Sequence, residues 1–188
     1  MGFALAWACN AWRQVRDILL DTDSSSSRTT LGADTVEPHH NLPLQRTSFI
    51  GRARELEDVK QLLASRQLLT LTGAGGCGKT RLALQAAAEV TSEYQDGTWL
   101  VELAAVTDHG GVPHAFATAV GLREVPDRAL ADALTGFLRN KSLLLVVDNC
   151  EHVVDAVAHL IDDVLRTCPQ VRILATSREP LGCVDETT

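Results

Sequence analysis

Residues 68–80 read LLTLTGAGGCGKT, a short apolar run that leads directly into a glycine-rich loop. The loop, residues 73–80, matches the pattern G-x-x-x-x-G-K-[ST]. Its four glycines let the backbone fold closely around an anion with the N–H groups pointing inward, and a helix that begins near Lys79 adds the positive end of its dipole. The stretch therefore predicts a phosphate-binding strand–loop–helix unit, a P-loop.

Two side chains of the loop have predicted chemical roles. Lys79 supplies a full positive charge toward the β- and γ-phosphates of a nucleotide, and the Thr80 hydroxyl is placed to ligate Mg²⁺. The alternative is a glycine-rich turn without a ligand. The residues expected to contact nucleotide in this stretch are Gly73, Ala74, Gly75, Gly76, Cys77, Gly78, Lys79, Thr80 and Arg81.

A second apolar run, residues 143–148 (LLLVVD), ends in Asp148. Ligands of α/β sheets collect at the carboxyl ends of strands, so Asp148 is the expected second ligand of the Mg²⁺. The next residue is Asn149, whose amide cannot take a proton from water. Glu151 is therefore either the general base or an acid that favours a helix N-terminus, and we expect slow hydrolysis.

Arg178 follows a third apolar run, residues 171–176. A guanidinium at that edge suits phosphate oxygens and could distinguish ATP from ADP by touching the γ-phosphate. The alternative is a surface arginine that caps the end of a strand.

The rest of the chain alternates between two periodicities, which predicts an α/β fold with a parallel sheet flanked by helices. Strands are expected at 68–72, 99–103, 142–147 and 171–176. Helices are expected at 52–64, 79–91, 112–120, 128–138 (capped by Asp127) and 152–166. Residues 1–41 are expected to form a short helix and a flexible linker that contains His39 and His40, and residues 42–188 the P-loop nucleotide-binding domain.

Composition excludes several classes of protein. The 188 residues are 45% apolar with a net charge of −7, so a chain that binds nucleic acid directly or lies in a membrane is not expected. The five cysteines form no CxxC pair, which argues against a zinc site or a disulfide framework and favours the cytoplasm.

Four motifs together resemble one family. They are FIGRAREL (49–56), the P-loop, LVVDNCEH (145–152) and RILATSREPLG (172–182), and they are similar to the STAND ATPase module of bacterial LuxR-type and SARP-type regulators, related to NB-ARC domains. The resemblance, over about residues 41–186, implies an AAA-like P-loop NTPase. It also implies that Gly51 and Arg52 lie near the adenine and that Arg178 is a phosphate sensor.

The same resemblance leads to expectations about the ends of the fold. The family's sheet order is 5-1-4-3-2, and a fifth strand and a winged-helix domain follow the module. Since the sequence ends at Thr188, we expect a truncated module whose strand 68–72 is an exposed edge with unpaired backbone groups.

The predicted function is an ATP- or ADP-binding switch with slow or no hydrolysis. Its expected partners are the regulatory or output domains of a signal-responsive regulator of transcription. Two alternatives stay open. A small-molecule kinase would need an acceptor pocket and an arginine-rich lid, and a degenerate remnant would bind nucleotide weakly.

Overall fold

The computed structural model describes residues 39–45, 51–123 and 129–188. The helix expected within residues 1–20, most of the expected linker, and Asp127 lie outside the described residues. The elements in chain order are α1 (Ala53–Ser65), β1 (Leu68–Leu71), α2 (Lys79–Val90), η1 (Thr91–Glu93), β2 (Thr98–Glu102), α3 (Gly111–Ala119), α4 (Leu130–Leu138), β3 (Leu144–Asp148), η2 (Cys150–His152), α5 (Val154–Thr167) and β4 (Arg172–Thr176).

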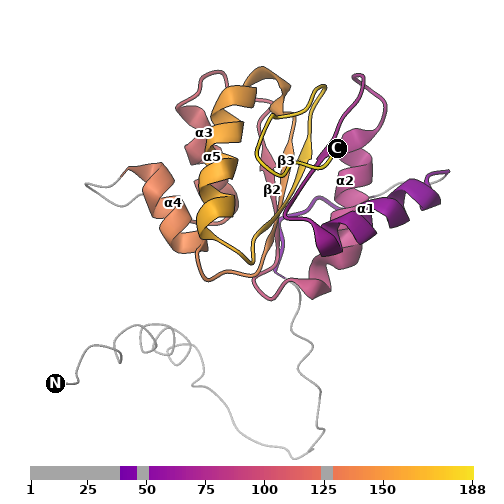
Figure 1. Ribbon diagram of the computed structural model, residues 1–188, viewed down its shortest axis with the longest axis horizontal. Helices are drawn as coiled ribbons and strands as arrows, with labels where there is room; N and C mark the ends of the chain where they lie inside the picture. Colours follow the sequence, from indigo (N-terminus) through magenta and orange to yellow (C-terminus); the bar gives the residue numbers. More distant parts are fainter. Residues whose placement is uncertain (1–38, 46–50, 124–128) are drawn as a thin grey trace, which may run out of the picture. The chain divides into compact units, whose positions relative to one another are not determined.

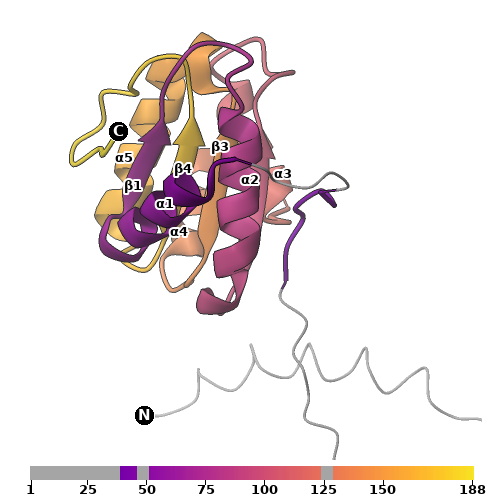
Figure 2. The ribbon, with the colours of Figure 1, turned by 90° about the vertical axis from the view of Figure 1, so that its right-hand side faces the viewer.

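The four strands form one parallel sheet in the order β1-β4-β3-β2. Helices α1 and α2 cover one face of the sheet, and α3, α4 and α5 cover the other (Figures 1 and 2). The predicted α/β fold is confirmed. The strand order also agrees with the order expected for the first four strands of the family.

The hydrophobic core lies in two layers, one on each face of the sheet. Side chains that alternate along β3 divide between the layers: Leu145 and Val147 pack on the α5 side, and Leu144 and Val146 pack on the α2 side. All five residues of β3 are buried. Because a strand covered on both faces has no solvent side, β3 is apolar at every position except its last.

The outer edge of β2 is covered by residues 39–41. His40 forms a parallel bridge with Thr98, and the Asn41 side chain donates to the Leu100 carbonyl at 2.9 Å and accepts from the Leu100 N–H at 2.5 Å. A Cβ at Gly97 would lie 1.9 Å from the His39 carbonyl oxygen, so only glycine allows this approach. These residues, assigned to the linker from composition, thus pack against the sheet.

The expected exposed edge at β1 is not what the structure shows. Thr187 pairs with β1 in parallel: its N–H donates to the Leu68 carbonyl at 3.2 Å, and its carbonyl accepts from the Thr70 N–H at 2.8 Å. Leu68 and Leu69 are buried in the two core layers, and Thr70 is buried as well. The prediction was wrong because it gave no structure to residues 183–188, where the Glu186 carboxylate accepts the N–H groups of residues 181 and 182 and holds the segment in place.

Asp96 joins the start of β3 to the turn that precedes β2. Its backbone N–H donates to the Ser142 carbonyl at 2.8 Å, while its carboxylate accepts from the Ser142 N–H at 2.8 Å and from Lys141 Nζ at 2.7 Å. Burial opposes ionisation of this carboxyl, but the bonds from Lys141 and Ser142 outweigh burial and lower the pKa of Asp96.

Two helices begin two residues later than expected. The helix predicted from residue 152 is preceded by the short helix η2 and begins only at Val154. The helix predicted from residue 128 begins at Leu130. Within the part of the chain that the structure describes, no helix has both the length and the apolar character needed to cross a bilayer.

Candidate functional site

The P-loop joins β1 to α2 with the backbone that its glycines permit. Gly73, Gly76 and Gly78 have φ angles of 144°, 77° and 87°, and Gly78 is the N-cap residue of α2 in the left-handed conformation. Side chains are strained at such angles, so the glycine spacing is a requirement of the turn. The predicted strand–loop–helix unit is therefore present.

Lys79 is folded back over the loop that it follows. Its ammonium group donates to the carbonyl oxygens of Gly73 at 2.7 Å and Ala74 at 3.0 Å, and it lies 4.0 Å from the Cys77 sulfur. The positive charge is thereby held at the centre of the loop. An anion bound there would compete with two neutral carbonyls for the ammonium protons, and a charged acceptor is the stronger of the two.

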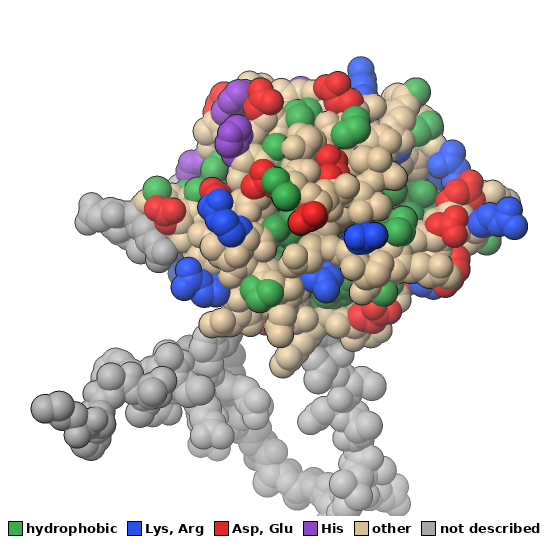
Figure 3. Space-filling model, viewed as in Figure 1, with side chains coloured by type: hydrophobic (Ala, Val, Ile, Leu, Met, Phe, Trp, Pro, Cys, Tyr) green, Lys and Arg blue, Asp and Glu red, His purple; other side chains and the backbone are tan. Residues whose placement is uncertain are grey.

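Two arginines from distant parts of the chain flank the same loop. Arg52 Nη1 lies 3.7 Å from the position that a Cβ of Gly78 would take, and Arg178 Nη2 lies 3.8 Å from the corresponding position at Gly75. The chain carries a net charge of −7, and Figure 3 shows basic and acidic side chains interspersed over one face. The gathering of Lys79, Arg52 and Arg178 around one loop is therefore unusual for a chain whose net charge is negative.

Thr80 and Asp148 are brought together as predicted, and a third residue joins them. The hydroxyls of Thr80 and Thr176 both donate to Asp148 Oδ1, at 2.7 Å and 2.5 Å. Thr176 Oγ1 also accepts from the Asn149 N–H at 3.1 Å. The carboxylate of Asp148, which is 7% exposed, is thus fixed from α2 and from β4.

Thr176 was assigned no role from the sequence. The sequence could have indicated this role. Thr176 is the last residue of β4 and Asp148 the last residue of β3, and adjacent parallel strands align their carboxyl ends. A hydroxyl residue in the last position of a buried strand is a candidate partner for the neighbouring carboxylate.

Glu151 and Arg178 form an ion pair, with Nε donating to Oε1 at 3.1 Å. Glu151 lies in the first turn of η2, which directly precedes α5. Both residues line a cleft of about 720 Å³ at the carboxyl ends of the strands, together with Ala104, Asn149, His152 and Glu179. The residues that line this cleft do not include those of the P-loop.

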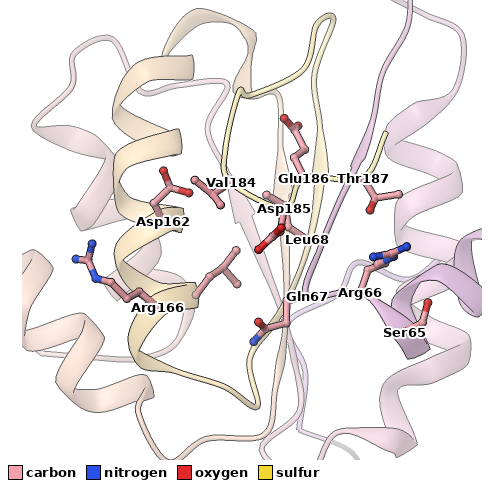
Figure 4. Close-up of a pocket in the computed structure, with 11 residues that line it drawn as sticks. Ser65, Arg66, Gln67, Leu68, Asp162, Arg166, Val184, Asp185, Glu186 and Thr187 are labelled. Carbon is pink, nitrogen blue, oxygen red and sulfur yellow. The ribbon is translucent and has the colours of Figure 1, made fainter.

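A larger cavity, of about 810 Å³, lies at the amino end of β1, and Figure 4 shows its lining. Arg66, Gln67 and Leu68 border it, together with Arg166 of α5 and residues 184–187. It adjoins the end of β1 opposite to the P-loop, so it is separate from the candidate site. Among the described residues, no group of three His, Cys, Asp or Glu side chains could hold a metal ion.

The cysteines near the site differ in reactivity. Burial, together with the nearby negative charges of Asp148 and Glu151, raises the pKa of Cys150 to about 12. Burial likewise raises the pKa of Cys183 to about 12. Both thiols therefore stay protonated near neutral pH, whereas Cys77 in the P-loop is only partly buried.

Of the remaining predicted residues, Gly51 lies just before α1 with a φ of 91°, and Arg81 lies exposed in the first turn of α2. The structure thus gathers Arg52, the P-loop, Asp148, Glu151 and Arg178 at one edge of the sheet. Whether Gly51 and Arg52 adjoin adenine stays a prediction.

Comparison with known proteins agrees with this geometry. The family model described as "AAA domain" matches residues 62–181. The structure of the ORC2 protein from Aeropyrum pernix, described as ADPNP–ADP complexes, has the same fold: its TM-score is 0.52 at 15% identity, over 68% of this chain and 42% of that one.

Two relatives come from Mycobacterium tuberculosis. The uncharacterised protein Rv0894 is 44% identical over 153 residues, which are 81% of this chain and 39% of that protein. Rv0890c, whose name describes it as an HTH-type transcriptional regulator, is 48% identical over 130 residues, which are 69% of this chain and 14% of that protein. The chain therefore spans well under half the length of these relatives.

Proposed function

We propose that this chain, which belongs to the AAA domain family, binds ATP or ADP with Mg²⁺ and acts as a slowly hydrolysing nucleotide switch within a signal-responsive regulator. The observation that carries the proposal is the convergence of Lys79, Arg52 and Arg178 on the P-loop of an otherwise acidic chain. Backbone N–H groups, a helix dipole and three cations together suit a polyphosphate.

The donor set at the edge of the sheet fits Mg²⁺. The Thr80 hydroxyl and the Asp148 carboxylate are hard oxygen ligands, and they already lie within 2.7 Å of each other. Mg²⁺ held there would neutralise part of the phosphate charge. Thr176 keeps Asp148 oriented whether or not Thr80 donates to it.

Slow turnover follows from the residues around Asp148. Asn149 occupies the position where many P-loop ATPases have an acid, and it cannot accept a proton. Glu151 forms an ion pair with Arg178, which occupies its carboxylate as long as the pair persists. We expect turnover far below the ~10 s⁻¹ that is typical of enzymes.

The switch itself is assigned to Arg178. Its guanidinium lies between the Glu151 carboxylate and the P-loop, so a γ-phosphate would offer it a second anionic partner. ATP and ADP would then differ in whether the ion pair with Glu151 persists. The names of relatives such as Rv0890c support an output in transcription, carried by other domains and not by direct contact of this chain with DNA. The four motifs support the STAND module as the closer relationship.

The test is titration calorimetry of the full chain with Mg-ATP. Lys79→Ala should weaken binding roughly 10- to 100-fold, because it removes a charge-assisted contact worth about 1.5–3 kcal/mol. The matched control is Lys60→Ala. Lys60 lies in α1 and pairs with Glu57 and Glu89, near the end of α2 far from the loop.

Equal affinity of wild type and Lys79→Ala would overturn the proposal. Thr80→Ala and Asp148→Ala test the metal separately. Their effects should be present with Mg²⁺ and vanish in EDTA, and defects of the same size in EDTA would contradict the metal roles.

A further inference from the structure

The candidate site has no acid next to Asp148 in the sequence, but the fold brings one beside it. β2 and β3 are neighbouring parallel strands, and Glu102 and Asp148 are paired residues at their carboxyl ends. The Leu103 N–H donates to the Asp148 carbonyl at 3.1 Å, so the pairing continues to the last residue of both strands. Neighbouring strands lie about 4.8 Å apart.

Both carboxylates belong to the same face of the sheet. Along β2, Trp99 and Val101 pack on the α5 side and Leu100 packs on the α2 side, which places Glu102 on the α2 side. Asp148 is on that side too, because it accepts from Thr80 of α2. Glu102 therefore lies on the same face of the sheet as Asp148, at the carboxyl end of the neighbouring strand.

The carboxylates of Glu102, Asp148 and Glu151 differ in their partners. Asp148 Oδ1 accepts from two threonines, and Glu151 is paired with Arg178. The Glu102 side chain is exposed, and its carboxylate has no hydrogen bond or ion pair with any of the described residues. It is thus the carboxylate that solvent reaches and that no cation holds.

We propose that Glu102 is the general base for the slow hydrolysis of ATP at this site, a proposal that rests on the function proposed above. The Glu102 carboxylate takes one proton from a water molecule. The water oxygen forms a bond to the γ-phosphorus as the bond from that phosphorus to the ADP oxygen breaks. ADP and inorganic phosphate leave, and the proton passes from Glu102 to solvent.

The experiment measures ATP affinity and phosphate release for the full chain and four variants. Glu102→Gln should bind Mg-ATP with wild-type affinity. It should release phosphate at least about 100-fold more slowly than the wild type, since general-base catalysis contributes 10²- to 10⁴-fold. Glu102→Asp should recover part of the rate. Glu151→Gln tests the rival base, and Glu93→Gln, at an exposed glutamate beyond the far end of α2, is the matched control.

The outcomes separate the two proposals. A wild-type chain that does not bind Mg-ATP overturns the function as a whole. A chain that binds Mg-ATP but releases no phosphate, or one in which Glu102→Gln keeps the wild-type rate, overturns the role of Glu102 alone. Loss of hydrolysis in Glu151→Gln and not in Glu102→Gln assigns the proton to Glu151.

Discussion

Replacing Thr176 by valine tests the arrangement around Asp148 most directly. The hydroxyl is 1% exposed, donates to Asp148 Oδ1 at 2.5 Å and accepts from the Asn149 N–H at 3.1 Å. Valine keeps the shape of threonine, so packing is retained. The hydrogen bond to a charged group is worth about 1.5–3 kcal/mol, and the orphaned N–H adds about 1 kcal/mol.

We therefore expect the free energy of unfolding of Thr176→Val to fall by roughly 2.5–4 kcal/mol. For a chain of this size that corresponds to a melting temperature lower by roughly 5–16 °C. Urea unfolding of the full chain, followed by circular dichroism at pH 7, measures the change. The m-value should stay constant if only stability is altered.

Thr70→Val is the matched control. Thr70 is also fully buried in a strand of the same sheet, but its hydroxyl has no hydrogen-bond partner among the described residues. Removing an unsatisfied hydroxyl should leave stability unchanged or raise it by up to about 1 kcal/mol. If the two variants unfold at the same urea concentration, the role assigned to Thr176 is wrong.

Three further predictions use features outside the P-loop backbone. Asp96→Asn should lower the melting temperature by about 2–4 °C at pH 7, since the partly exposed pair with Lys141 is worth up to about 1 kcal/mol. The pKa of Asp96 is lower in the folded chain than in the unfolded chain, so the stabilisation by its carboxylate is complete above the unfolded pKa of about 3.9. This stabilisation is lost as the pH falls through the folded pKa. If wild type and Asp96→Asn differ in melting temperature by the same amount at pH 7 and pH 2.5, the prediction is contradicted. Iodoacetamide at pH 8 should label Cys77 well before Cys150, and Mg-ATP should protect Cys77; peptide mapping that finds equal rates would refute this. Gly97→Ala should lower the melting temperature because its Cβ would collide with the carbonyl oxygen of residue 39, and thermal unfolding at the wild-type temperature would show that the approach is not required.

Much of the fold could be predicted because it depends on local patterns. The P-loop signature, the apolar run of β3 and the helical stripe of α2 each lie within a dozen residues, and all three were placed correctly. Asp148 and Thr80 were also paired correctly, since the carboxyl ends of parallel strands and the P-loop meet at one edge of a sheet.

The remaining features depend on which distant residues lie side by side. Strand register, which composition and periodicity do not give, places Glu102 and Thr176 beside Asp148. Thr187 covers β1 through two backbone hydrogen bonds. Such bonds can be formed by residues with almost any side chain, so the sequence does not indicate them. The ion pair of Glu151 with Arg178 required knowing that a short helix, and not the long one, follows β3.

The amide of Asn41 has a consequence for how copies of this chain can associate. Its oxygen and nitrogen take up both backbone groups of Leu100, as a residue of an added strand would. An open strand edge is the usual template for sheet-to-sheet aggregation. A second molecule can extend the sheet past Leu100 only by displacing Asn41, so one side chain protects this rim of the domain from self-assembly.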